Sequence, residues 1–216
     1  MYQPVHHEEK RLEVMQGLIR AHPLGLLVSN GADGPLANLV PFLLDGERSA
    51  YGTLRAHVAR ANPQWRAIAE RAGEKVLVIF QGVNAYITPS WYATKRETGK
   101  VVPTWNYAIV QARGRARIIE DAAWLEAHVR ALTDWREGAR ENPWSVSDAP
   151  PDFISMQLRA IVGIEIEIEE IAGKWKVSQN RPSADRAGVV EGLRAMKDDA
   201  DAAVMAELVR QYGGLE

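Results

Sequence analysis

The clearest hydrophobic pattern lies between residues 161 and 170, where apolar and polar positions alternate without a break. Successive side chains of an extended strand point to opposite faces, so this alternation is typical of a half-buried strand. The apolar positions are Val162, Ile164, Ile166 and Ile168, and the positions between them include Gly163, Glu165, Glu167 and Glu169. The segment therefore predicts a strand with an apolar face turned inward and an acidic face turned outward.

Earlier in the chain, short apolar runs are separated by Gly, Asn and Asp, which is the pattern of an antiparallel meander. It predicts three strands, in residues 24–29, 36–44 and 49–54. A strand pair follows, with residues 75–81 and 84–89 on either side of Gly82 and Val83. Another strand runs from Trp105 to Ile119 with a bend at Gly114. An antiparallel sheet of this size closes most economically into a small barrel, because closure removes exposed edge strands.

Helical periodicity separates and follows these strands. A helix over residues 8–21 is stopped by Pro23, and the change of pattern at Ala56 predicts a second helix that reaches about residue 72. Residues 94–100 read as a loop. Asp121 caps a helix over residues 122–136. Further helices are predicted around residues 153–158, 184–196 and 200–212. The expected fold is therefore α+β and mainly β, a barrel rather than a sandwich.

Composition narrows the class of protein. The chain has 216 residues, 46% hydrophobic and 25% charged, with no cysteine and a net charge of −2. These are the values of a soluble globular domain, and no long uncharged apolar run predicts a membrane segment. We expect a cytoplasmic protein without disulfides. The five histidines lack the spacing of metal ligands, and any affinity for DNA must come from a local patch.

Aromatic side chains are crowded into two nearby segments, residues 86–92 (YITPSWY) and 102–107 (VPTWNY). Tryptophan and tyrosine have broad faces and one polar group, so they suit a flat heteroaromatic ligand that needs stacking and a few hydrogen bonds. Strand ends whose aromatic residues pack into the core would give the same residue types. The sequence leaves both interpretations open.

A second candidate site lies in residues 53–60 (TLRAHVAR), where a hydroxyl, two guanidiniums and an imidazole precede the predicted second helix. Free backbone N–H groups at a helix start favour an anion, so a phosphate would fit there. Solvated charges at the helix start are the alternative. Lys174, Lys176 and Arg181 beside Trp175 read as a solvated strand edge rather than a nucleic-acid patch. Neither a dinucleotide-binding fingerprint nor a P-loop is present.

Six segments in order along the chain together resemble the PaiB-like family, which is described as FMN-binding negative transcriptional regulators. They are residues 37–42 (ANLVPF), 57–65 (HVARANPQW), 86–92 (YITPSWY), 102–107 (VPTWNY), 161–166 (IVGIEI) and 173–180 (GKWKVSQN). The resemblance implies an antiparallel split β-barrel with peripheral helices and a helical C-terminus, related to pyridoxamine-phosphate oxidases and flavin reductases. Residues 1–182 would form the FMN-binding domain, and residues 183–216 a helical extension packed on it.

The resemblance also implies a homodimer with FMN bound at the subunit interface. By this likeness the phosphate would be held by Thr53, Arg55, His57 and Arg60. The isoalloxazine and ribityl region would be lined by Ser90, Trp91, Tyr92, Trp105 and Asn106, while Lys176, Gln179 and Arg181 would reach in from the partner subunit. Three functions follow as expectations: a negative transcriptional regulator, an FMN-dependent oxidoreductase, or a flavin or haem sensor module. Contact with DNA is implied by the family alone.

Overall fold

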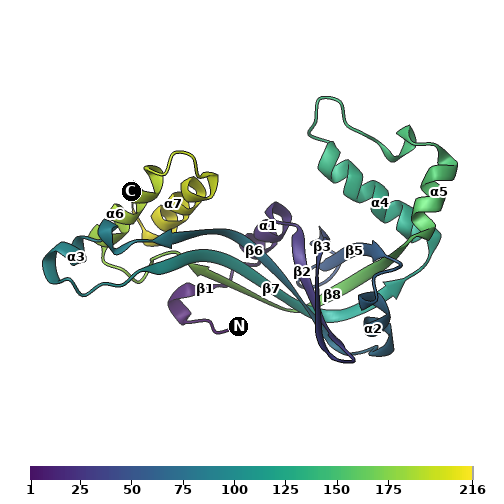
Figure 1. The fold of residues 1–216 in the computed structure, drawn as a ribbon, viewed down its shortest axis with the longest axis horizontal. Coiled ribbons are helices and arrows are strands. Elements are labelled where there is room, and N and C mark those ends of the chain that lie inside the picture. Colours follow the sequence, from purple (N-terminus) through teal and green to yellow (C-terminus); the bar gives the residue numbers. More distant parts are fainter. Residues whose placement is uncertain (216) are drawn as a thin grey trace. The chain divides into compact units, whose positions relative to one another are not determined.

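The computed structural model describes residues 1–215, and Figure 1 shows its helices and strands. The strands are β1 (Glu8–Glu9), β2 (Leu24–Gly31), β3 (Gly34–Pro41), β4 (Leu43–Asp45), β5 (Thr53–Ala59), β6 (Lys75–Ile87), β7 (Thr104–Ile119) and β8 (Ile161–Lys176). The α-helices are α1 (Leu12–Ala21), α2 (Gln64–Glu70), α3 (Ala93–Thr98), α4 (Ala122–Glu137), α5 (Pro151–Arg159), α6 (Ser183–Arg194) and α7 (Ala200–Gly213). Short 3₁₀ turns are η1 (Val5–His7), η2 (Pro89–Trp91) and η3 (Val146–Asp148). No helix in the described part of the chain is long and apolar enough to cross a membrane.

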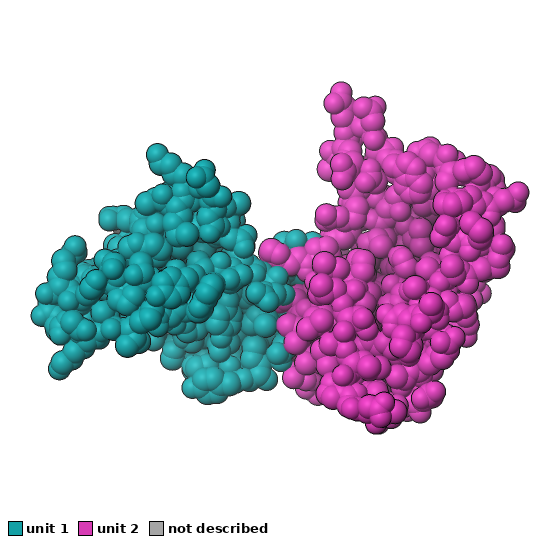
Figure 2. All heavy atoms as spheres, viewed as in Figure 1, with its two compact units in different colours: residues 1–21, 81–111, 172–216 teal, residues 22–80, 112–171 magenta. Residues whose placement is uncertain are grey.

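The chain divides into two compact units, which Figure 2 colours separately. Unit 1 consists of residues 1–21, 81–111 and 172–216, and unit 2 of residues 22–80 and 112–171. Strands β6, β7 and β8 contribute residues to both units. Helices α6 and α7 belong to unit 1.

The strands pair in the order β3-β2-β6-β7-β8-β5-β4, and β1 pairs with β8 outside this path. Strand β2 is antiparallel to β3 and β6, and β5 is antiparallel to β4 and β8. The first two strands of the predicted antiparallel meander are confirmed, although the second is divided into β3 and β4. The bounds of the third, predicted over residues 49–54, are wrong, because residues 49–52 lie outside the strands and β5 begins at Thr53.

In unit 2, the alternating segment forms the first part of β8, as predicted. Its apolar positions Val162, Ile164 and Ile166 are fully buried in the core. The prediction that the glutamates all face solvent is wrong at Glu165, which is only 7% exposed. Arginine side chains from other parts of unit 2 cover this carboxylate, and such long-range neighbours leave no trace in the local pattern.

Three other predictions about local structure are wrong. The chain stays extended through residues 56–59, so the helix predicted from Ala56 begins only at Gln64. Register with β8 explains the difference, because Ala56 to Ala59 pair with Ile164 to Ile161. The predicted strand pair across Gly82 and Val83 is one continuous strand, β6. Residues 94–100 were predicted as a loop, yet α3 occupies most of them.

In unit 1, a hydrogen-bonded cluster joins the beginning of the chain to its last helix. Arg11 on the segment before α1 donates to both carboxylate oxygens of Glu9, at 2.9 and 2.6 Å. It also donates to the hydroxyl of Tyr212 on α7 at 2.8 Å, and that hydroxyl donates to Glu9. The ring of Tyr212 stacks on Trp175 with an interplanar angle of 14°. Charge-assisted hydrogen bonds of this kind are stronger than neutral ones.

The Glu9 cluster predicts a loss of stability in acid. Burial alone would raise the pKa of Glu9, but the hydrogen bonds from Arg11 and Tyr212 outweigh it and lower the pKa from 4.5 to about 2. The stabilisation is therefore complete above pH 4.5 and is lost as the pH falls from 4.5 to about 2. We expect Glu9→Gln to lower the free energy of unfolding by about 2 kcal/mol at pH 7. Urea unfolding of both proteins from pH 7 to pH 3 should show the difference shrinking with acid.

The matched control is Glu8→Gln, because the neighbouring Glu8 forms its ion pair with Lys10, whose side chain is 74% exposed. Exposed pairs contribute about 0–1 kcal/mol. Equal losses in the two variants would show that the Glu9 cluster is not a stabilising contact.

Candidate functional site

One face of β5 carries three of the predicted phosphate ligands. Thr53, Arg55 and His57 alternate with apolar residues that are buried in the core of unit 2. The antiparallel register places Arg55 opposite Glu165 and His57 opposite Gly163 on β8. The structure therefore brings these three residues onto one face, on a strand rather than at a helix start.

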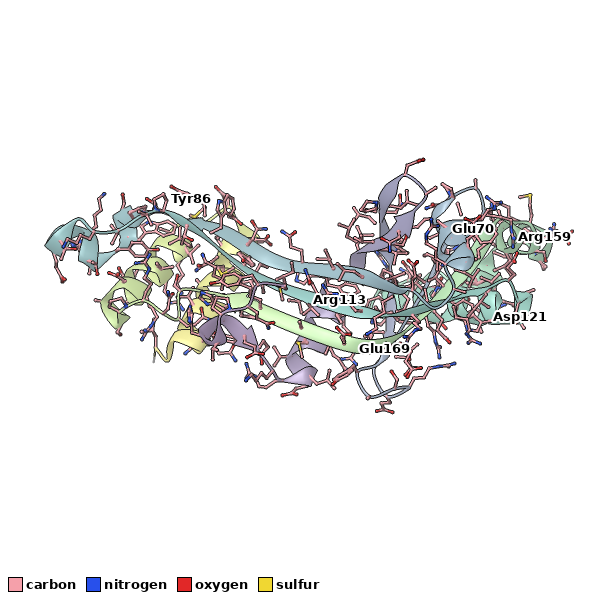
Figure 3. All side chains as sticks on the ribbon, turned by 90° about the horizontal axis from the view of Figure 1, so that it is seen from below. Glu70, Tyr86, Arg113, Asp121, Arg159 and Glu169 are labelled. Atoms are coloured by element: carbon pink, nitrogen blue, oxygen red, sulfur yellow. The ribbon has the colours of Figure 1, made fainter. Side chains whose placement is uncertain are left out.

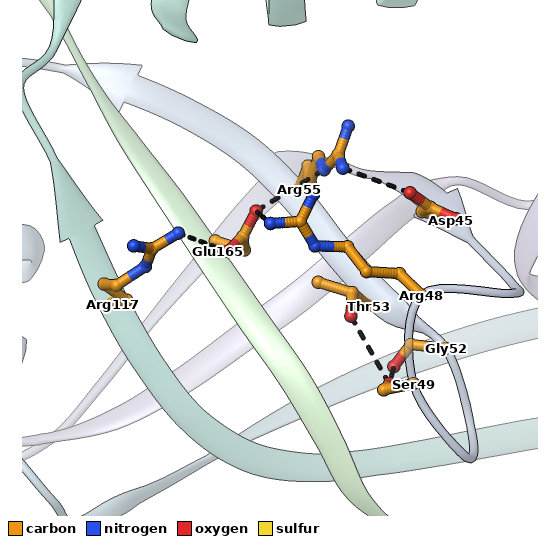
Figure 4. Close-up of polar contacts among 8 residues, drawn as sticks. All are labelled: Asp45, Arg48, Ser49, Gly52, Thr53, Arg55, Arg117 and Glu165. Atoms are coloured by element: carbon orange, nitrogen blue, oxygen red, sulfur yellow. Dashed lines mark hydrogen bonds and ion pairs between the residues drawn. The ribbon is translucent and has the colours of Figure 1, made fainter.

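Glu165 lies among three arginines, as Figure 4 shows. Arg117 on β7 donates to its Oε1 atom at 2.6 Å, while Arg48 and Arg55 each lie 3.5 Å from its Oε2 atom. Arg55 also donates to Asp45 at 3.0 Å. We call these five side chains, Asp45, Arg48, Arg55, Arg117 and Glu165, the Glu165 cluster. Its three guanidiniums and two carboxylates leave one net positive charge, so the cluster can accept one further anion.

Thr53 and Arg60, both also predicted phosphate ligands, differ in their surroundings. Thr53 is buried, and its hydroxyl lies 3.3 Å from the hydroxyl of Ser49 in the loop before β5. Arg60 pairs with Glu120 and donates to the backbone carbonyls of Arg159, at 3.1 Å, and Ile161, at 3.3 Å. Arg60 therefore fastens the end of β5 to the segment between α5 and β8, and its guanidinium is largely occupied.

His57 packs against a second histidine that the sequence analysis did not single out. His128 on α4 is 3% exposed, its ring centroid lies 5.3 Å from that of His57, and Trp124 stacks on its other side at 5.1 Å. Trp124 needs Gly163 beneath it, because a Cβ atom there would lie 2.4 Å from the indole. Among the described residues, both ring nitrogens of His128 and the Nδ1 atom of His57 are buried without a hydrogen-bond partner. Burial lowers the pKa of both imidazoles, which favours their neutral forms.

Unit 1 gathers a second set of predicted ligands on one face of β8 and its neighbours. Asn106 donates to the hydroxyl of Ser178 at 2.9 Å, and Lys176 donates to Thr104 at 2.5 Å and to the carbonyl of Trp105. The side-chain oxygen of Gln179 accepts the backbone N–H of Val177 at 2.8 Å and lies 3.1 Å from Nδ1 of His7.

Three cationic side chains, Lys174, Lys176 and Arg181, lie at and just after the end of β8. Lys174 is 7% exposed and contacts the carbonyl of Tyr2 and the rings of Tyr2 and Tyr107, while Arg181 lies over the ring of Tyr92. Within the described residues, neither Lys174 nor Lys176 forms an ion pair. Burial, Lys174 and Arg181 together lower the pKa of Lys176. Poorly hydrated cations without counter-ions favour an anionic or electron-rich ligand.

The aromatic residues of unit 1 divide into two groups. Tyr92 is 1% exposed and belongs to the core, as the alternative interpretation of the aromatic stretch expected. Trp91 and Trp105 instead line an open cleft of about 560 Å³ together with Tyr86. Ser90 lies beside them in η2, where its hydroxyl accepts a hydrogen bond from Lys95 at 3.1 Å. The stretch therefore serves both packing and a binding surface.

A split antiparallel sheet that carries separate cationic and aromatic groups defines a binding protein for a flat anionic cofactor. Residues 1–170 match the family model described as "Putative FMN-binding domain". The chain belongs to this family, and FMN is the cofactor that the membership assigns to it. The residues fit FMN, because the Glu165 cluster has a surplus positive charge for a phosphate and the cleft exposes aromatic faces for a ring system.

The chain is also similar to known proteins in sequence and in structure. An uncharacterized protein of Emericella nidulans is 36% identical over 100% of this chain and 99% of its own length. The protease synthase and sporulation protein PAI 2 of Bacillus subtilis is 32% identical over 97% of this chain and 96% of its own length, which confirms the resemblance to the PaiB-like family. The FAD and heme binding protein from Mycobacterium smegmatis is similar in structure, with a TM-score of 0.55 and 16% identity over 79% of this chain and 73% of that one. The predicted split-barrel fold is confirmed.

The buried histidine pair predicts a second pH dependence of the free energy of unfolding, in mildly acidic solution. Burial, the neighbouring His57 and Arg55 lower the pKa of His128 from 6.5 to about 4. The unfolded chain then takes up a proton that the folded chain refuses, so stability is lost as the pH falls from 6.5 to about 4. We expect His128→Phe to reduce the slope in this range by about 1.4 kcal/mol per pH unit. Urea unfolding between pH 4 and pH 7.5 measures it.

Phenylalanine retains a flat ring against Trp124, so the variant should fold. His22→Asn serves as the control, because His22 lies outside the buried pair. An unchanged slope in His128→Phe would show that this imidazole is not held neutral by its surroundings.

Proposed function

We propose that the chain acts as an FMN-binding homodimer in which each flavin is held by both subunits. Thr53, Arg55, His57 and Arg60 of one subunit hold the phosphate. The ring and ribityl region is lined by Ser90, Trp91 and Trp105, backed by the buried Tyr92 and Asn106, with Lys176, Gln179 and Arg181 from the other copy.

The observation that carries this proposal is the positive surplus of the Glu165 cluster. A phosphate carries more than one negative charge at neutral pH and is recognised best by guanidinium groups. Arg55 lies 3.0 Å from Asp45 through a terminal nitrogen and 3.5 Å from Glu165 through its buried Nε atom, which forms no hydrogen bond in the described chain. An incoming phosphate would therefore compete with these two carboxylates for Arg55, and the positive surplus of the cluster favours its binding.

The division of the ligands between the two units supports a shared site. The phosphate ligands all lie in unit 2, and the ligands of the ring and ribityl region all lie in unit 1. A dimer can bring Lys176, Gln179 and Arg181 of one copy to the phosphate ligands of the other. Bound FMN supplies electron-transfer chemistry, and the side chains supply binding, orientation and charge around it.

Mixing two variants tests the shared site. Arg55→Gln and Lys176→Gln should each weaken FMN binding about tenfold or more, because one removes a contact with the phosphate and the other removes a cation that the other copy supplies. A heterodimer of the two variants contains one site with both an intact Arg55 and an intact Lys176. FMN fluorescence quenching should therefore recover to about half of the wild-type sites in purified heterodimers.

Arg71→Gln is a suitable control, since Arg71 lies at the end of α2 and outside both ligand groups. Heterodimers that bind no FMN would contradict a site built from two subunits. Wild-type protein that does not quench FMN would contradict the flavin proposal itself.

We infer two candidate roles for the flavin-bound dimer. Similarity to PAI 2 favours negative regulation of transcription, and a net charge of −2 makes indirect regulation more consistent with the chain than direct DNA binding. The open aromatic cleft favours the alternative, an FMN-dependent oxidoreductase that accepts electrons from a nicotinamide and passes them to a small acceptor.

Two assays separate these roles. An oxidoreductase should oxidise NADPH or NADH under air faster than the same concentration of free FMN. A direct regulator should shift particular genomic fragments in an electrophoretic assay with a preference that survives added salt, whereas purely electrostatic binding is lost steeply with salt. We expect turnover without a sequence-specific shift. A specific, salt-resistant shift without turnover would contradict the oxidoreductase role and support direct regulation of transcription.

A further inference from the structure

The aromatic cleft of unit 1 contains a chemical feature that flavin binding does not require. Its walls come from β6, η2, β7 and the region between α6 and α7. The lining residues are Asn84, Ala85, Tyr86, Thr88, Trp91, Trp105, Met196, Asp199 and Asp201. They include two carboxylates, and no lysine, arginine or histidine.

Three aromatic side chains form the apolar part of the cleft. Tyr86 and Trp105 are 48% and 55% exposed, and their rings meet edge to face at 5.9 Å. Figure 3 labels Tyr86 on its strand. Trp91 is fixed against α6, because a Cβ atom at Gly192 would lie 2.2 Å from its indole and one at Gly188 would lie 2.0 Å from its backbone carbonyl. The cleft therefore combines a fixed indole with two accessible rings.

The carboxylates give the cleft its charge. One oxygen of Asp199 accepts the backbone N–H of Ala202 at the start of α7, which leaves its second oxygen available. Asp201, two residues further on in the first turn of α7, is exposed. Neither carboxylate forms an ion pair within residues 1–215. An anionic group would be repelled here, and a neutral apolar ligand would bury carboxylates without a partner.

We propose that this cleft binds a small organic cation with an alkylated nitrogen. Aromatic faces attract such a cation through their quadrupoles, and a nearby carboxylate compensates the charge that leaves water. Alkylated nitrogen fits better than a metal ion, because the walls are aromatic and the two aspartates alone cannot fill a coordination shell. A volume of about 560 Å³ lies within the range of small-molecule sites.

This site shares Trp91 and Trp105 with the proposed ring region, yet the inference does not rest on flavin binding. The cation would contact side chains of unit 1 alone. A substrate or effector of this class would then bind next to the flavin, at the edge of the cleft that carries Trp91 and Trp105.

Calorimetric titration of the full-length chain with choline tests the proposal. The comparison ligand is the uncharged tert-butyl isostere of choline, which has nearly the same shape and lacks the charge. We expect choline to bind at least about tenfold more tightly than the isostere. Asp201→Asn and Trp105→Leu should each weaken choline about fivefold to tenfold, while both side chains are exposed enough for the variants to fold.

Asp198→Asn is the matched control, because Asp198 is also exposed and precedes α7 but does not line the cleft. Choline should also shift the indole N–H signal that is missing from the spectrum of Trp105→Leu. Equal affinity for choline and its isostere, no measurable binding of choline, or equal losses in Asp198→Asn and Asp201→Asn would overturn the proposal. The titrations use flavin-free protein, because Trp91 and Trp105 also line the proposed flavin region, and none of these outcomes then depends on whether the protein binds FMN.

Discussion

The contact on which the site of unit 2 depends is the carboxylate of Glu165 within its three arginines. A buried carboxylate is costly unless it is paired, and three guanidiniums gathered around nothing would repel one another. Glu165 therefore allows positive charge from β5, β7 and the loop before β5 to collect on one face. Since the partners outnumber the carboxylates, the same contact that stabilises the sheet leaves a surplus for an anion.

Unit 1 reaches a similar surplus by another route. There the cations Lys174 and Lys176 are placed by β8, and tyrosine rings and backbone carbonyls take the place of carboxylates. Rings and carbonyls stabilise an ammonium less than an ion pair does, so both lysines keep most of their attraction for a ligand. The neighbouring cleft has the opposite charge, and a ligand with separate anionic, flat and cationic parts would find each group in a different place.

The sequence predicted the elements whose signals are local. Strict alternation identified β8, and the side chain of Asp121 caps α4 by accepting the N–H of Trp124, as predicted. Prediction failed at residues 56–60, where pairing with β8 overrides an alanine-rich pattern. His128, Arg48 and Arg117 could not be recognised as neighbours of the site, because only long-range pairing brings them to β5 or to Glu165. The prediction of a solvated strand edge is wrong at Lys174, which is buried because the rings of Tyr2 and Tyr107 cover its ammonium group. Thr53, Arg55 and His57 could be singled out because they are close in sequence.

The hydrogen bonds between Glu9, Arg11 and Tyr212 fasten the first residues of unit 1 to its last helix. A shortened version of the protein that ends before Tyr212 would therefore remove one of the two hydrogen-bonding side chains from the buried carboxylate of Glu9. It would also uncover the indole of Trp175. Trimming a few C-terminal residues, which usually costs little, should here loosen the opposite end of the chain. Affinity tags are better attached through linkers that leave Glu9, Arg11 and Tyr212 in contact.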